Sequence, residues 1–70
     1  MVFSYDNLWK MLIDRKMKKK DLAEQARITP TTMSNMGKGK AVSLETIGRI
    51  CRLLDCEIGD IVELRYEEGD

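Results

Sequence analysis

Residues 18–36 read KKKDLAEQARITPTTMSNM and predict two short helices joined by a tight turn. The first helix, residues 19–26, carries apolar side chains at helical spacing. These are Leu22, Ala23 and Ala26. Arg27 falls in the turn, and Ile28 is expected to fill the space between the two helices. The pair therefore predicts a helix-turn-helix unit that needs further helices to cover its apolar side.

The second helix of the pair, residues 30–36, has a clear start. Thr29 can accept a hydrogen bond from the first turn, and Pro30 suits the first helical position because its missing N–H costs nothing there. Met33 and Met36 lie three residues apart and share an apolar face, which we assign to the core. The other positions are small, polar and uncharged: Thr31, Thr32, Ser34 and Asn35. Such a helix suits a groove of DNA, because its first side chains can reach base edges and its N-terminus favours phosphate.

Residues 5–13 carry the strongest amphipathic pattern, with apolar side chains at i, i+3, i+4, i+7 and i+8. These positions are Tyr5, Leu8, Trp9, Leu12 and Ile13. Ser4 is expected to cap this helix, because its hydroxyl can accept a hydrogen bond from the first turn. We interpret Trp9 as the centre of the hydrophobic core. The alternative role, a platform on which bases stack, agrees less well with a position on the apolar face.

Two further helices are predicted after residue 42. Ser43 caps the first, residues 44–54, and Gly48 lies in its interior, where glycine costs about 1 kcal/mol relative to alanine. The apolar face of this helix comprises Leu44, Ile47, Ile50, Cys51 and Leu54. A short helix over residues 58–62 follows, and then an acidic tail, residues 65–70. The lead, residues 1–4, and the segment around Leu64 and Tyr66 are candidates for short terminal strands.

Length and charge limit the functional class. Seventy residues with 43% apolar content predict one small domain, residues 1–70, without room for a deep catalytic cleft. Residues 1–52 hold eleven Lys or Arg against five Asp or Glu, a net charge of +6. Residues 53–70 hold one Arg against seven acids, a net charge of −6. This asymmetry indicates a polyanionic partner for the basic half.

Several chemistries are missing from the sequence. Cys51 and Cys56 are too few for a disulfide scaffold, and the chain has no His to complete a zinc site, so we interpret both as small buried apolar residues. No catalytic motif is present, and the glycines at 37 and 39 lack P-loop spacing, so we expect no enzyme, metal, cofactor or small-molecule ligand. Without a signal peptide or a membrane-length apolar segment, we expect a cytoplasmic protein with no membrane partner.

Six short motifs, at their spacing along the chain, match the pattern of a known protein family. They are Leu22-Ala23-Glu24, Ile28-Thr29, Met33-Ser34, Gly39-Lys40, Ser43-Leu44-Glu45-Thr46 and Leu53-Leu54. Together they resemble the phage Cro/C1 repressor-type helix-turn-helix family, and most of all its small single-domain bacterial regulators. The resemblance implies an all-α, five-helix, lambda-repressor-like DNA-binding domain. It also implies sequence-specific binding of double-stranded DNA by a transcriptional regulator, most simply a repressor, with residues 30–36 in the major groove.

The resemblance also implies which residues contact DNA. By analogy with the family, base contacts are expected from the start of the helix over residues 30–36, which is the third helix of the chain. The residues are Pro30, Thr31, Thr32, Ser34 and Asn35. Phosphate contacts are expected from the residues that flank it, at Lys18, Lys19, Lys20, Thr29, Lys38 and Lys40. The alternative for the base-contacting candidates is that they are simply exposed on a well-capped helix. The alternative for the lysines is that they form a solvated face without a partner. For Lys40 a further alternative is contact with the C-terminal carbonyls of the third helix.

Two positions depart from the family pattern. Lys19 stands where family members often have a glutamine on a phosphate, and a basic side chain suits phosphate as well. Arg27 stands where the turn usually has glycine, and an arginine at positive φ is mildly strained. The glutamines and arginines that often read bases are replaced by shorter Thr, Ser and Asn, so we expect modest direct readout.

We expect a homodimer, because one short helix of small polar residues makes too few base contacts for tight binding alone. The candidate interface residues are Leu53, Ile58, Val62, Leu64 and Tyr66, with Val2 and Phe3 nearby if both ends form strands. The alternative is a monomer in which these side chains fold back.

The competing function is a protein–protein interaction module, such as an antitoxin-like or accessory subunit. A steep loss of affinity with salt would distinguish DNA binding from it.

Overall fold

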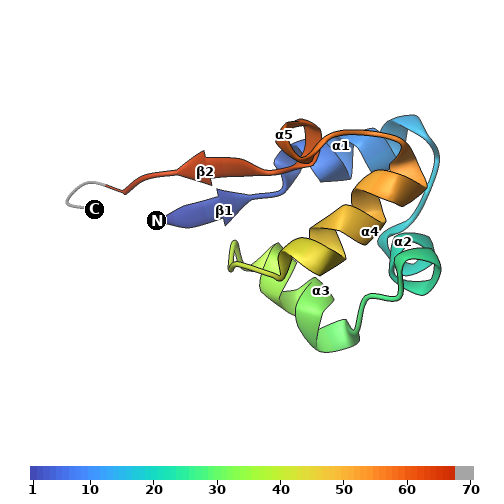
Figure 1. Ribbon diagram of the computed structural model, residues 1–70, viewed down its shortest axis with the longest axis horizontal. Coiled ribbons are helices and arrows are strands. Elements are labelled where there is room, and N and C mark those ends of the chain that lie inside the picture. Colours follow the sequence, from blue (N-terminus) through green and yellow to red (C-terminus); the bar gives the residue numbers. More distant parts are fainter. Residues whose placement is uncertain (68–70) are drawn as a thin grey trace.

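Five helices and two short strands make up residues 1–67, the part of the chain that the computed structural model describes (Figure 1). Their order is β1 (Val2–Ser4), α1 (Asp6–Asp14), α2 (Lys19–Ala26), α3 (Pro30–Gly37), α4 (Leu44–Leu54), α5 (Ile58–Ile61) and β2 (Glu63–Arg65). The predicted five-helix fold with short terminal strands is confirmed. Of the predicted acidic tail, residues 68–70 lie outside the described part. Each helix within residues 1–67 is too short or too polar to cross a membrane.

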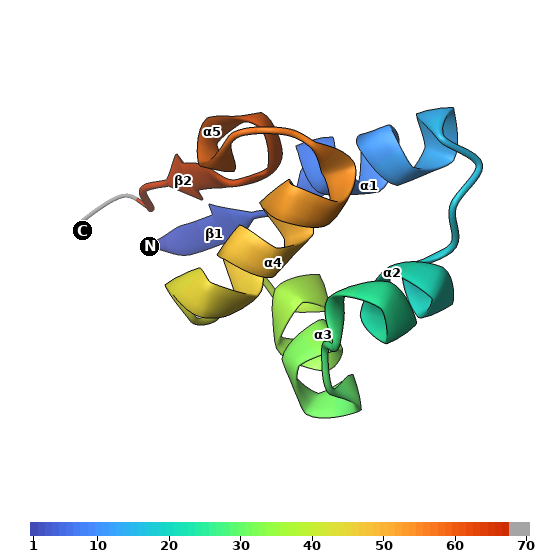
Figure 2. The same ribbon diagram turned by 45° about the vertical axis from the view of Figure 1, so that its right-hand side comes forward.

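Helix α4 lies in the middle of the fold. Figures 1 and 2 both show α3 on one side of α4 and α5 on the other. Helix α1 packs against α5, and α2 packs against α4. Strands β1 and β2 pair antiparallel, with Val2 opposite Arg65, Phe3 opposite Leu64 and Ser4 opposite Glu63. This ribbon projects from the end of the molecule remote from α2 (Figure 1).

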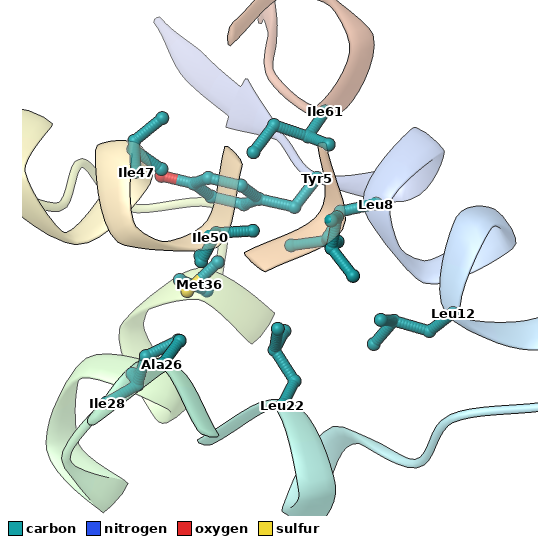
Figure 3. Packing of buried hydrophobic residues seen from close by; sticks show 11 residues of the cluster. Tyr5, Leu8, Leu12, Leu22, Ala26, Ile28, Met36, Ile47, Ile50 and Ile61 are labelled. Carbon is teal, nitrogen blue, oxygen red and sulfur yellow. The ribbon is translucent and has the colours of Figure 1, made fainter. Parts of the chain in front are cut away.

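All five helices contribute to the core. Its buried apolar residues are Tyr5, Leu8, Leu12, Leu22, Ala26, Ile28, Met36, Ile47, Ile50, Leu54 and Ile61. Figure 3 shows how side chains from α1, α2 and α3 meet those of α4. Because a two-helix unit of this length buries too little apolar surface to be stable alone, α2 and α3 keep their relative position only within the whole bundle.

Two predicted core positions in α1 are wrong. Trp9, predicted as the centre of the core, is half-buried at its edge, and Ile13 is 74% exposed. Leu8 and Leu12 form the row of α1 that faces the core, with exposed fractions of 0% and 2%. Trp9 and Ile13 each follow one of these leucines by one residue, which turns them by about 100° around the helix. The apolar spacing in the sequence contains both rows and does not show which one faces inward.

The other differences lie mainly near helix starts. Leu44, predicted for the apolar face of α4, is 74% exposed because it is the first residue of that helix and lies beyond the core. Ser4 is not the N-cap of α1; Tyr5 holds that position, and the Ser4 Oγ accepts a hydrogen bond from the Asp6 N–H at 3.4 Å. Met36 is buried as predicted, whereas Met33 is half-buried against the core.

Cys51 and Cys56, predicted to be buried, are instead half-buried; both are free, Cys51 in the last turn of α4 and Cys56 just after the helix. Burial and, to a lesser extent, the neighbouring Cys51 raise the pKa of the Cys56 thiol to about 11. The thiolate form of Cys56 is therefore scarce at neutral pH. In residues 1–67, His, Cys, Asp and Glu side chains form no group able to hold a metal ion.

A side chain of α4 fixes the joint between α2 and α3. Arg27 ends α2 in the left-handed region, with φ 57° and ψ 49°, so the carbonyls at this end lack helical partners. Arg49 donates hydrogen bonds to two of them, from Nε to the Ala26 carbonyl at 2.8 Å and from Nη2 to the Arg27 carbonyl at 3.3 Å. Glu45, one turn earlier on α4, holds the same guanidinium at 3.4 Å through Nη1.

Replacing Arg49 with alanine should lower the free energy of unfolding by about 1.5–3 kcal/mol, because a charged donor is removed from two backbone carbonyls. Arg52→Ala is the matched control. Arg52 is exposed on the same helix, and its side chain makes no hydrogen bond or ion pair within residues 1–67, so its loss should change stability by no more than about 0.5 kcal/mol. Urea unfolding followed by circular dichroism measures both. Equal losses in the two variants would contradict the bracing role of Arg49.

Candidate nucleic-acid interface

The start of α3 is held by a pair of threonines. The Thr29 Oγ1 accepts a hydrogen bond from the Thr32 N–H at 3.2 Å, as predicted for an N-cap. The Thr29 hydroxyl also donates to the Thr32 Oγ1 at 2.9 Å. The proton of Thr29 is thus used within the chain, and a phosphate contact from this hydroxyl would have to replace that bond. Thr32 keeps its own hydroxyl proton for an external acceptor.

Helix α3 has an inner apolar face and an outer polar face. Met36 points into the core (Figure 3), and Thr32, one turn earlier, borders this inner face. Pro30, Thr31 and Ser34 are exposed, whereas Thr32 and Asn35 are half-buried. The first turn holds no acidic residue, so no carboxylate there neutralises the positive end of the helix dipole. This face offers hydroxyl and amide groups next to a helix end that favours anions.

Two groups of lysines flank this face in the fold. Lys18, Lys19 and Lys20 surround the start of α2, and Lys38 and Lys40 follow the end of α3. All five are exposed, and within residues 1–67 none of them forms an ion pair with a carboxylate. The Asp21 carboxylate accepts a hydrogen bond from the Lys18 backbone N–H at 3.1 Å and secures the start of α2.

The loop that carries Lys38 and Lys40 is tied to both α3 and the N-terminal strand. The backbone N–H of Lys40, rather than its ammonium, donates to the Asn35 carbonyl at 2.9 Å. The carbonyl of Gly39 accepts from the Phe3 N–H at 3.0 Å, and Gly39 itself has φ 74°. A side chain at residue 39 would meet Val2 Cγ1 at 2.7 Å, so glycine is required here. These contacts fix the backbone from which the side chains of Lys38 and Lys40 extend.

Tyr5 adds a further tie to this loop. Its hydroxyl donates to the Lys40 carbonyl at 2.8 Å, across 35 residues of sequence. Burial raises the pKa of the Tyr5 phenol, and a backbone hydrogen bond with Val42 partly offsets that rise. Tyr5 and Arg49 both shape this surface, and both act through contacts between distant residues that no local sequence pattern reveals.

The charges of the chain are separated in space. The two lysine groups lie at the start of α2 and after α3, whereas α5 lies on the opposite side of α4 (Figures 1 and 2). The acids after α4 are all exposed; within the described residues they are Asp55, Glu57, Asp60, Glu63 and Glu67. A polyanion is therefore attracted to the α2–α3 side and repelled from the α5 side.

Comparisons with known proteins agree with this geometry. The family model of the Cro/C1-type helix-turn-helix DNA-binding domain matches residues 7–67. A relative from Bacillus subtilis (strain 168), the uncharacterized HTH-type transcriptional regulator YozG, is 42% identical over 64 residues, which cover 89% of this chain and 76% of YozG. The crystal structure of the transcriptional regulator VanUg, Form II, is similar with a TM-score of 0.91 and 44% identity, over 94% of this chain and 88% of that chain. The resemblance predicted from the sequence motifs is confirmed.

Proposed function

The chain belongs to the Cro/C1-type helix-turn-helix DNA-binding domain family, and we propose that it regulates transcription with α3 in the major groove of double-stranded DNA. The observation that carries this proposal is the exposed polar face of α3, flanked by two groups of lysines without carboxylate partners in residues 1–67. A DNA-binding domain is not an enzyme. The competing function as a protein–protein interaction module is not favoured, because YozG and VanUg are both named as transcriptional regulators.

The flanking lysines are proposed to bind phosphates and so to set the position of α3 on the duplex. Lys18, Lys19 and Lys20 would contact the backbone on one side of the groove, and Lys38 and Lys40 on the other. Phosphate contacts position a protein without reading sequence, because the backbone is the same at every base pair. Each contact releases bound counterions, so each contributes to the salt dependence of binding.

Replacing Lys19 or Lys38 with alanine should weaken binding to all duplexes alike and lower the slope of log affinity against log salt by about one unit. Fluorescence anisotropy with labelled duplexes of mixed sequence, at several salt concentrations, measures the slope. Lys10→Ala is the control, because Lys10 is an exposed lysine of α1 outside both flanking groups. A changed sequence preference with an unchanged salt slope would count against the phosphate role.

Base readout is proposed for α3, where Pro30, Thr31 and Ser34 are exposed and Thr32 and Asn35 are half-buried. Thr31 and Asn35 are four residues apart and share one side of the helix. An asparagine amide can pair with adenine through two hydrogen bonds, and a threonine methyl can contact the methyl of thymine. These two residues are therefore the strongest candidates for sequence preference.

Asn35→Ala should relax the preference at one base position and weaken binding to the preferred site by about 1–3 kcal/mol. Thr31→Ala should act at a neighbouring position with a smaller effect. Selection of bound sequences from random duplexes measures both preferences, and Gln25→Ala, an exposed polar residue of α2, serves as the control. If both α3 variants select the same sequences as the parent, readout would depend on DNA shape instead.

We propose that two copies pair through β2 and α5, which places two α3 helices on half-sites about one turn of DNA apart. Ile58, Leu64 and Tyr66 are exposed there by 49%, 47% and 72%. The outer edge of β1 is covered at Phe3 by the Gly39 carbonyl, whereas no strand within residues 1–67 pairs with the outer edge of β2. An unpaired strand edge with apolar neighbours favours association with another copy.

Two of the residues expected at the interface are less suited to it. Val62 is half-buried against the core of its own chain. Leu53 lines a surface groove with Arg27 and Arg52, at the end of α2, and not beside β2. The proposed contact therefore has Ile58, Leu64 and Tyr66 at its centre, with acids such as Glu63 at its rim.

Sedimentation of the parent at micromolar concentration should show a species of twice the chain mass, and Leu64→Lys should shift it to the mass of one chain. The added ammonium groups would be buried near one another at a symmetric contact, which is unfavourable. Ile13→Lys removes a still more exposed apolar side chain, on α1, and should leave the dimer intact. A parent that sediments as one chain, with and without DNA, would contradict the dimer.

We also propose that regulation takes the form of repression and occurs in the cytoplasm, where bacterial DNA is located. A protein that occupies an operator excludes other proteins from the same base pairs, so repression requires no contact beyond DNA binding. In a purified transcription reaction, adding the protein should reduce transcripts from a promoter that contains a selected site. A promoter without the site is the control, and an increase in transcripts would contradict repression.

A further inference from the structure

Lys19 is held by an aromatic ring. Its Nζ lies 4.2 Å from the centroid of the Trp9 ring, and Lys19 is the first residue of α2. Trp9 comes from α1, ten residues earlier, and is the one tryptophan of the chain. An ammonium over an indole face is attracted by the ring quadrupole, and tryptophan is the strongest partner among the aromatic side chains. The half-buried position of Trp9 keeps one face available for this contact.

Trp9 is itself held in place by the core. Its ring lies 6.4 Å from that of Tyr5, centroid to centroid, at an interplanar angle of 50°. Tyr5 is 3% exposed and its hydroxyl is bonded to the Lys40 carbonyl. Trp9 also lines two shallow hollows, one with Lys18 and Lys19 and the other with Lys38 and Gly39. The indole therefore stands between the two lysine groups that flank α3.

We propose that Trp9 is a positioning residue for the DNA backbone: its ring holds the Lys19 ammonium at the start of α2, where a phosphate is bound. The inference rests on the proposed DNA-binding function. A free lysine loses much rotamer freedom when it binds a phosphate. A lysine already placed on the ring has lost part of that freedom in the unbound protein. Its N–H groups that point away from the ring remain free to donate to a phosphate oxygen.

A merely structural role for Trp9 predicts a different pattern. If Trp9 only fills the edge of the core, replacing it weakens DNA binding equally whether or not Lys19 is present. If Trp9 positions Lys19, its replacement matters only while Lys19 is there. The two roles are therefore separated by the coupling between the two residues in DNA affinity.

The test is a double-mutant cycle with Trp9→Leu and Lys19→Ala, with affinity for mixed-sequence duplex DNA measured by anisotropy at fixed salt. Trp9→Leu should weaken binding by about two- to five-fold in the parent and by much less in the Lys19→Ala background. The matched cycle with Lys20→Ala should show independent effects. Independent effects of Trp9→Leu and Lys19→Ala would overturn the proposal. A parent that does not bind DNA would instead overturn the proposed function.

Two further measurements apply if Trp9→Leu does not fold. Trp9→Phe keeps an aromatic ring with a weaker quadrupole. Its effect on DNA affinity should therefore also depend on Lys19, but should be smaller than that of Trp9→Leu. Trp9 emission also reports on the contact directly, because no other tryptophan contributes. Saturating DNA should change this emission in the parent and change it much less in Lys19→Ala. Equal changes in both proteins, or no coupling in the Trp9→Phe cycle, would overturn the proposal.

Discussion

The hydrogen bonds of Arg49 fix the angle at which α3 leaves α2. The left-handed conformation of Arg27 ends α2 and leaves two backbone carbonyls, of Ala26 and Arg27, to which the Arg49 guanidinium donates. For the Ala26 carbonyl, whose contact with Arg49 is partly buried, the lack of a donor would be costly. Helix α4 therefore braces the helix pair through the Arg49 guanidinium and also supplies Ile47 and Ile50 to the core beneath it. The position of the polar face of α3 depends on both contributions.

The two sides of α3 have different roles. The inner side of α3 contributes Met36 to the core, which leaves its hydroxyl and amide groups on the outside. The two lysine groups lie on either side of Trp9, which lines one hollow with Lys19 and another with Lys38. The tie between the Tyr5 hydroxyl and the Lys40 carbonyl then connects α1 to the second lysine group. A surface for a polyanion results, and the acids of the carboxyl end lie away from it.

Much of this fold could be predicted from the sequence where the determinants are local. Thr29, Pro30 and Ser43 start helices through contacts within three residues, and the structure has those helices within a residue of the expected bounds. The choice between Leu12 and Ile13 for the core could not be made, because apolar spacing does not tell which of two adjacent rows faces inward. The contacts of Arg49 and Trp9 depend on partners in other helices, so they could not be predicted from the sequence either. The base-contacting residues themselves remain a prediction from the family resemblance.

Methylation protection on a duplex selected from random sequences tests directly whether α3 binds in the major groove. Methylation of guanine N7 probes the major groove, and methylation of adenine N3 probes the minor groove. The bound protein should protect guanine N7 in two half-sites about one helical turn apart and leave adenine N3 between them reactive. Protection confined to adenine N3, or tight binding without any protection of guanine N7 in sites that contain guanine, would contradict major-groove binding by α3.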